Sequence, residues 1–285
     1  MRVSIICPLY NGEKYIKDLH KALKAQEQVQ LSSIEYILTE SGDNSEEILK
    51  AIGATYKVIG RKEFSHSRTR EDAAFRAEGD IIVFITQDII IKDNLWLYNL
   101  TNPIVKGECE ASFSRQICDN NTIEKYVREK NYPEASRVVS KEDINSLGFR
   151  TFFYSDAASA IRRDIYVELG GYDGKHLVIN EDMYLAYKII TNGYRIKYCS
   201  ESQVIHSHKF KLKELYKRYY DTGVFLQENS HFLRYKANKS GFGLFGHVLK
   251  RSCEEKNLPV LVNIVPNFAA RFLGSYFGKK SVKKK

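Results

Sequence analysis

The sequence predicts an α/β protein with a mixed, mainly parallel sheet, flanking helices and a basic helical extension at the C-terminus. Through the first hundred residues, short β-rich runs alternate with helical patterns, which is typical of βαβ units. The chain has 285 residues, of which 43% are hydrophobic, enough for a proper core. Residues 1–208 contain 27 Lys and Arg against 30 Asp and Glu, whereas residues 209–285 contain 17 against 5. We therefore expect an α/β domain over residues 1–208 and a basic extension over residues 209–285.

Four strands are predicted in the first ninety residues. They are VSIICPLY (3–10), EYILT (35–39), YKVIG (56–60) and DIIVFIT (80–86). Helices are expected between them, because apolar residues recur at helical spacing and polar residues open the segments. In open sheets of this kind ligands bind beyond the carboxyl ends of the strands. Residues 8–11, 40–44 and 86–88 are therefore expected to form one rim.

The rest of the α/β domain is less regular. A strand is predicted at EASFSRQI (110–117), with a polar helix after it. Glu181 and Asp182 open a further helix, where acidic side chains complement the helix dipole. His206 and His208 alternate in QVIHSHKF (203–210), so on a strand they would share one face.

Cysteine usage and the apolar runs indicate where the protein works. Five cysteines lie far apart and form no CxxC, which fits a reducing cytoplasm better than a disulfide framework or a zinc site. No basic leader precedes the first strand, and no apolar run approaches about 18 residues. We expect a cytoplasmic protein that is neither exported nor membrane-spanning.

Asp88 directly follows a strand that reads as buried, where a carboxylate is costly to desolvate unless a cation or water compensates it. There is no GxGxxG after a strand and no GKS or GKT, so a glycine-rich phosphate loop is not expected. A divalent metal, Mg²⁺ or Mn²⁺, can neutralise a diphosphate instead, and it prefers carboxylates with an occasional imidazole. The candidate ligands are Asp88, His206 and His208. The alternatives are a helix cap for Asp88 and a surface position for both histidines.

Several short motifs occur in an order that resembles a large enzyme family. They are VSIICPLYNGEKYI, TESGDNSEE, FITQD, GGYDG, NEDMYLAYKI and GYRIKYCSESQVIHSH. Over roughly residues 1–210 this order is similar to that of family-2 glycosyltransferases with the GT-A fold. The resemblance implies that Pro8, Tyr10 and Glu40 contact the nucleobase and ribose of a nucleotide sugar.

The same resemblance implies a diphosphate site and a catalytic base. The family's Asp-x-Asp element corresponds to Thr86-Gln87-Asp88, which keeps only the last carboxylate. Its acidic pair corresponds to Glu181 and Asp182. Asp182 would take the proton of the acceptor hydroxyl in a single inverting displacement, and Glu181 would orient a neighbouring group or bind an acceptor hydroxyl. An ordinary role at the start of a helix is the alternative for both acids.

A narrower resemblance rests on EFSHSRTREDAA (63–74), together with TQD and HSH. These segments look like those of bacterial rhamnosyltransferases that use dTDP-L-rhamnose to build surface polysaccharides. The resemblance implies that His66 and Arg70 lie close to the nucleotide sugar, and a guanidinium near a helix start can pair with phosphate oxygens. Asp156 is expected to contact the donor sugar or the acceptor.

The implied reaction is transfer of L-rhamnose from dTDP-β-L-rhamnose to a lipid-linked saccharide in the synthesis of capsule, O-antigen or rhamnan. One alternative is a UDP-hexose or UDP-N-acetylhexosamine transferase of the same fold. Another is a catalytically silent module that binds a nucleotide or carbohydrate, which the incomplete Asp-x-Asp element would favour.

The extension over residues 209–285 is rich in Lys, Arg and Tyr with scattered Leu and Phe. Each Lys or Arg near anionic lipid contributes about 1 kcal/mol, and amphipathic aromatic residues suit the membrane interface. We expect peripheral attachment to the inner face of the cell membrane, where a lipid-linked acceptor would lie. Packing against a second copy of the chain, giving a homo-oligomer, is the alternative. Nucleic acid is not an expected partner, because no RNA-binding motif accompanies the charge.

Overall fold

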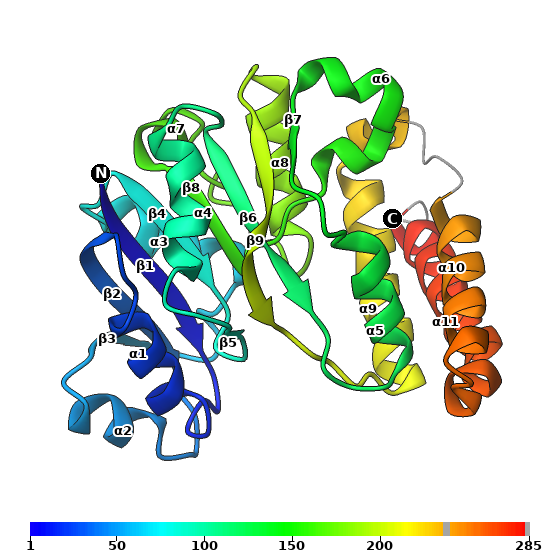
Figure 1. Ribbon diagram of the computed structural model, residues 1–285, viewed down its shortest axis with the longest axis horizontal. Coiled ribbons are helices and arrows are strands. Elements are labelled where there is room, and N and C mark those ends of the chain that lie inside the picture. The colour runs from blue at the N-terminus through cyan, green and yellow to red at the C-terminus, as the bar shows by residue number, and fades with distance from the viewer. Residues whose placement is uncertain (236–239, 283–285) are drawn as a thin grey trace.

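The computed structural model describes residues 1–235 and 240–282, which form a sheet with helices on both faces and a helical bundle at one end (Figure 1). The nine-stranded sheet has the order β3-β2-β1-β4-β8-β6-β9-β5, and β7 pairs with β9. The strands are β1 (Arg2–Leu9), β2 (Gln30–Thr39), β3 (Thr55–Ile59), β4 (Ile81–Ile85), β5 (Ile90–Ile91), β6 (Ala111–Ile117), β7 (Arg137–Val139), β8 (Ala158–Arg162) and β9 (Ile196–Ile205). The helices are α1 (Ile16–Lys24), α2 (Ser45–Ala51), α3 (His66–Arg76), α4 (Trp96–Val105), α5 (Ile123–Asn131), α6 (Ile144–Leu147), α7 (Arg163–Glu168), α8 (Glu181–Thr191), α9 (Leu212–Glu228), α10 (Ser240–Glu254) and α11 (Leu258–Val282).

Strand direction brings distant polar segments to one edge of the sheet. β1 pairs in parallel with β2 and with β4. β8 runs antiparallel to both β4 and β6, so β6 points the same way as β4. β9 is parallel to β6. The carboxyl ends of β1, β2, β4, β6 and β9 therefore lie at one rim, and this is why residues 86–88 and 206–208 can meet.

Apolar side chains fill both faces of the sheet and hold this rim in place. All five residues of β4 are buried, as expected of a central strand covered on both sides. One face packs against α1, α2 and α4, which bury Ile16, Leu49 and Trp96. The other face packs against α3, α7 and α8, which bury Ala73 and Leu185 among others. Full burial of one Leu or Ile side chain contributes about 1.5–3 kcal/mol, so the two layers stabilise the sheet strongly.

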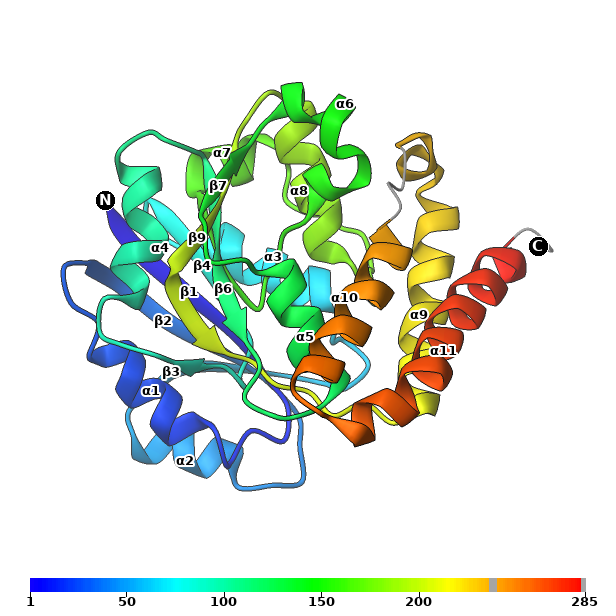
Figure 2. The same ribbon diagram turned by 45° about the vertical axis from the view of Figure 1, so that its right-hand side comes forward.

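The C-terminal bundle is held by close contact between α9 and α11, which lie side by side (Figure 2). A Cβ atom added to Gly278 would lie 2.0 Å from the backbone O of Tyr220. Glycine therefore allows the two helix backbones to approach more closely than any other residue would. Arg271 of α11 is buried and pairs with Glu124 of α5 at 2.5 Å. This ion pair ties the bundle to the α/β domain.

The predicted fold class is confirmed, and one local expectation is wrong. β9 ends at Ile205, so His206 and His208 follow the strand and do not lie on it. Among the described residues, α11 is the helix that is long and apolar enough to cross a membrane by length and composition alone, because an 18-residue window within it has a mean hydropathy of 1.2. Polar residues are scattered along this helix, so its apolar character emerges only as an average and no uninterrupted run reveals it.

Candidate active site

Three side chains that could bind a metal ion converge at the rim. Asp88 follows β4, and His206 and His208 follow β9. One ligand atom from each lies within 4.8 Å of the others. Nε2 of His206 is 3.6 Å from Oδ1 of Asp88, and the two imidazole centroids are 4.4 Å apart. The structure thus brings together the three side chains that were predicted as metal ligands.

The protonation states of these three groups suit a cation. Burial opposes ionisation of Asp88, but its interactions with His206 and then with His208 hold the pKa of its carboxyl well below the usual value. Burial lowers the pKa of His206, and burial together with the charge of His206 lowers the pKa of His208 to about 4. At neutral pH the cluster therefore offers one carboxylate and two neutral imidazoles, which are the forms that bind metals.

Gln116, at the end of β6, orients His206. Nδ1 of His206 lies 2.8 Å from Oε1 of Gln116. The amide nitrogen of Gln116 donates to the hydroxyl of Ser155 at 2.8 Å, and Arg128 donates to Oε1 of Gln116. This network assigns the proton of His206 to Nδ1 and leaves Nε2 facing Asp88. Metal-ligating histidines usually have a second hydrogen bond of this kind.

A second, buried cluster joins α3, α8 and the segment before β8. Arg70 is 2% exposed, and its Nη1 lies 3.3 Å from Oε1 of Glu181. Asp156 is 1% exposed and accepts hydrogen bonds from the hydroxyls of Tyr172 at 2.6 Å and Ser159 at 2.9 Å. Burial raises the pKa of Asp156 to about 6, which Arg70 opposes and Glu181 reinforces. Both oxygens of Asp156 thus already have protein donors.

Asp182 lines a cavity of about 220 Å³ that His208 also lines. Burial, followed by the negative charges of Glu181 and Asp156, raises the pKa of Asp182 well above the usual value. Arg218, which lines the same cavity, opposes this rise. A carboxylate with a raised pKa is a stronger proton acceptor once it is ionised. The candidate base and a candidate metal ligand therefore share one hollow.

Tyr10 and Gln87 join the ends of β1 and β4 on another part of the rim. The backbone N–H of Tyr10 donates to Oε1 of Gln87, and Nε2 of Gln87 donates to the backbone O of Tyr10, each at 2.9 Å. The Tyr10 ring is exposed, with the guanidinium of Arg61 5.8 Å from its centroid. Arg61 also donates to the backbone O of Glu40 at 3.0 Å. Tyr10, Arg61 and Glu40 thus form an exposed surface next to Gln87 and Asp88.

The other residues predicted to contact the donor, Pro8, His66 and Arg70, occupy three different kinds of position. Pro8 lies inside β1, opposite Ile37 of β2. His66 opens α3 with its ring 5.1 Å from that of Phe64, and its backbone O accepts a hydrogen bond from Arg70. Nη1 of Arg70 contacts Glu181 and the backbone O of His66, and the buried Nε lacks a partner among the described residues. These positions favour a role for Arg70 in orienting α3 and α8, and its contact with phosphate stays a prediction.

Sequence reasoning missed Arg61, Gln116, Arg128 and Arg218. They come from a loop, a strand and two helices that only the folded chain brings to the rim. Gln116 carried one usable signal, because a polar residue near the end of a predicted strand at this rim is a candidate for the site. The three arginines carried none, since nothing in their local sequence separates them from solvated surface residues.

Comparison with known proteins places the chain among characterised relatives. The model of the family described as "Glycosyl transferase family 2" matches residues 4–170. The O-antigen chain rhamnosyltransferase RfbN of Salmonella typhimurium is 34% identical over 235 residues, which are 79% of this chain and 72% of that protein. The O-antigen chain rhamnosyltransferase WbaN of Salmonella anatum is 32% identical over 282 residues, covering 97% of this chain and 89% of that one.

Solved structures share the fold at low identity. Residues 1–349 of S. aureus TarS align with a TM-score of 0.57 and 15% identity over 100% of this chain and 92% of that one. The mannosyltransferase PcManGT of Pyrobaculum calidifontis, in complex with GDP-Man and Mn²⁺, aligns with a TM-score of 0.59 and 13% identity, covering 99% and 86%. At these identities the likeness concerns the fold alone.

Proposed function

The chain belongs to glycosyl transferase family 2, and we propose that it transfers L-rhamnose from dTDP-β-L-rhamnose, with inversion, to a lipid-linked saccharide in cell-surface polysaccharide synthesis. Its class, a glycosyltransferase, follows from the family. The choice of rhamnose is supported by two relatives, 34% and 32% identical, that are O-antigen chain rhamnosyltransferases. The donor nucleotide and the acceptor are our inference from the site and from these relatives.

Asp88, His206 and His208 would hold a divalent metal, Mg²⁺ or Mn²⁺. The donor set fits, because one ionised carboxylate and two neutral imidazoles converge and Gln116 fixes the tautomer of His206. When bound, the ion would neutralise charge on the leaving diphosphate. The structure of PcManGT contains GDP-Man together with Mn²⁺, which supports the same expectation here.

The nucleotide would lie along the rim beside this metal site. The exposed ring of Tyr10 offers a stacking surface for a base, and the carboxylate of Glu40 offers an acceptor for base or ribose donors. Gln87 holds Tyr10 in place through its two hydrogen bonds and lies next to Asp88. Pro8 and His66 would shape this part of the site from β1 and α3.

Asp182 would act as the general base. It faces the cavity that His208 also lines, so an acceptor hydroxyl there lies between the base and the donor. The carboxylate takes the hydroxyl proton as the oxygen attacks the anomeric carbon, and the bond to the diphosphate breaks on the opposite face. Glu181 and Arg70 would position Asp182 through their buried pair, and Asp156 would support them from the segment before β8.

The observation that carries the proposal is the shared cavity of Asp182 and His208. We expect Asp182→Asn to lower kcat by about 10²- to 10⁴-fold, the usual contribution of a general base, while thermal-shift binding of dTDP-rhamnose stays as in the wild type. Asp88→Asn is expected to remove the stabilisation that Mn²⁺ or Mg²⁺ gives to the nucleotide complex. If the wild-type enzyme neither hydrolyses dTDP-rhamnose nor transfers its sugar, the donor assignment is wrong.

Two other functions are separated by the same measurements. A UDP-sugar transferase is favoured by TarS, whose structure has been solved in complex with UDP-GlcNAc. It predicts that UDP protects the protein against thermal unfolding better than dTDP in the presence of Mn²⁺. A catalytically silent binding module predicts that Asp182→Asn changes no function at all.

We also propose that the bundle attaches the enzyme to the inner face of the cell membrane. α11 exposes a row at heptad-like spacing, comprising Leu258, Val262, Val265, Ala269, Phe272 and Tyr276. Lys279 and Lys280 follow this row at the end of the helix. An apolar row beside basic residues suits an anionic lipid surface. Arg271 is buried in its pair with Glu124, which favours a helix that lies on the membrane over one that crosses it.

A further inference from the structure

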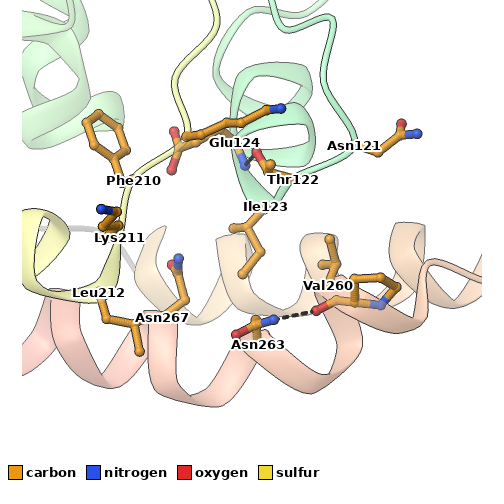
Figure 3. A pocket seen from close by; sticks show the side chains of 12 residues that line it. Asn121, Thr122, Ile123, Glu124, Phe210, Lys211, Leu212, Val260, Asn263 and Asn267 are labelled. Atoms are coloured by element: carbon orange, nitrogen blue, oxygen red, sulfur yellow. Dashed lines mark hydrogen bonds between the residues drawn. The ribbon is translucent and has the colours of Figure 1, made fainter.

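We propose that a groove between α5 and α11 binds the saccharide of the acceptor, away from the hydroxyl that reacts. The groove has a volume of about 510 Å³ and is bounded by the start of α5, residues 209–212 and the first half of α11 (Figure 3). This inference rests on the proposed function. It adds a binding surface outside the rim where donor and base were placed.

The groove adjoins the catalytic cavity. Glu124 and Phe210 line both hollows. Phe210 also lies 5.1 Å, centroid to centroid, from His208. A chain of sugars that reaches Asp182 with its terminal hydroxyl can therefore continue past Phe210 and Glu124 into the groove.

The wall formed by α11 contains two asparagine side chains, each with one free hydrogen-bonding atom among the described residues. Nδ2 of Asn263 donates to the backbone O of Pro259 at 2.8 Å, which leaves its Oδ1 without a partner among the described residues. Oδ1 of Asn267 accepts from Nε of Arg271 at 2.8 Å, and across the described ranges its Nδ2 has no partner. The two side chains stand four residues apart on α11 and both line the groove (Figure 3). An acceptor and a donor one helical turn apart match neighbouring sugar hydroxyls.

The other lining groups include an aromatic ring and the side chains of Lys209 and Lys211. Phe210 offers an aromatic surface against which the apolar face of a sugar ring can pack. Glu124, an acidic residue of the lining, is held in its pair with Arg271 at 2.5 Å, and the ammonium groups of Lys209 and Lys211 can donate hydrogen bonds to sugar hydroxyls. The polar lining residues of α11 lie next to its exposed apolar row, in which Val262 is 77% exposed. The saccharide part of an acceptor could then lie in the groove while its lipid part lies along this row.

The test uses Asn263, because a matched control exists. Asn263→Ala removes a side chain that lines the groove, and Asn263→Trp fills the space. Asn192, at the end of α8, makes the same bond to the carbonyl four residues earlier, from Nδ2 to the backbone O of Lys188 at 2.8 Å. Asn192→Ala therefore repeats the loss of a helix contact without touching the groove. Melting temperatures of all variants report whether they fold.

The acceptor probe is the pool of lipid-extractable saccharides from cells that lack this gene. We expect Asn263→Ala to raise the KM for this pool about five-fold, the value of one hydrogen bond, and Asn263→Trp to raise it further. The KM for dTDP-rhamnose and the hydrolysis of donor without acceptor should stay as in the wild type, and Asn192→Ala should match the wild type throughout. An unchanged acceptor KM in both Asn263 variants, or an equal rise of this KM in Asn192→Ala, would overturn the proposal that the groove binds the acceptor. Wild-type enzyme that hydrolyses the donor but transfers nothing to the pool would overturn the acceptor assignment itself.

Discussion

The residues of the site show how burial sets the chemistry of carboxylates. Asp156, Glu181 and Asp182 lie around one buried guanidinium, that of Arg70, and they influence one another's charge. Burial and the charges of neighbouring carboxylates raise the pKa values of Asp156 and Asp182, so these two groups retain protons that free carboxyl groups would lose. This is the opposite of Asp88, whose neighbouring imidazoles favour its ionised form. An acid–base centre beside a cation site requires both kinds of carboxylate: one that exchanges protons near neutral pH and one that stays ionised.

The raised pKa of Asp156 predicts a pH dependence of stability. In the folded chain its pKa is about 6 against the ordinary 3.8, so the folded state holds more protons between these values. The free energy of unfolding therefore falls as pH rises from about 4 to about 6, by up to about 3 kcal/mol from this group. Asp156→Asn should abolish this loss, making the variant more stable relative to the wild type at pH 7 than at pH 5. Urea unfolding at both pH values measures the difference, and an equal difference at the two values would contradict it.

At the level of elements, the bundle depends on glycines that let helices touch. Gly223 of α9 and Gly278 of α11 are positions where an added Cβ would lie closer than 3 Å to the backbone of the other helix. Backbone contact of this kind fixes the rotation of α11 about its axis. It thereby decides that Asn263 lines the groove while Val262 faces outward. The glycines thus position both proposed acceptor surfaces without contacting either ligand.

Substituting Gly278 should separate packing from helix propensity. Gly278→Ala is expected to lower the free energy of unfolding by about 1–3 kcal/mol, because the methyl group forces α9 and α11 apart. Gly243→Ala in α10 is the control, since no described residue lies within 4 Å of its added Cβ. It should be neutral or raise stability by up to about 1 kcal/mol, because alanine is the better helix former. Thermal unfolding measures both, and a loss of the same size in the two variants would argue against the contact.

At the scale of the whole molecule, charge and apolar surface are concentrated at one end. The last 77 residues contain 17 Lys and Arg against 5 Asp and Glu, and the described part of them forms the bundle beside the sheet (Figure 2). The exposed row of α11 lies in this same bundle. The proposed acceptor groove opens between the row and the catalytic cavity. In our proposal, this end of the molecule receives a lipid-linked substrate and the rim receives a soluble nucleotide sugar.

A single aspartate in the row tests membrane attachment. Val262→Asp should lower binding to vesicles of phosphatidylcholine and phosphatidylglycerol by roughly ten-fold or more, because burying a Val side chain contributes about 1.5–3 kcal/mol. Val105→Asp is the matched control, since Val105 is 52% exposed at the end of α4. Co-sedimentation with vesicles measures binding, and light scattering measures mass. If Val262→Asp left vesicle binding intact but reduced the mass of an oligomer, the row would be an interface between copies of this chain.

The sequence by itself determined the fold class, the strands β1 to β4 and β6, and the family. These follow from local periodicity and from ordered motifs, which are properties of neighbouring residues. It also singled out Asp88 by its position after a strand, and His206 and His208 by their residue type. The expected place of the two histidines on a strand was wrong, since the hydrogen bonding that ends β9 at Ile205 depends on its neighbours in the sheet.

Only the tertiary structure decided which side chains face one another. Arg70 reads in sequence as a cation near a helix start, but the packing of α3 on α8 buries it against Glu181. Gln116 and Arg218 enter the site from elements far apart in the chain. The groove exists only because glycine contacts set α11 against α9 and an ion pair sets it against α5. Periodicity specifies which face of an element is apolar, whereas the pairing of faces depends on contacts between residues distant in sequence.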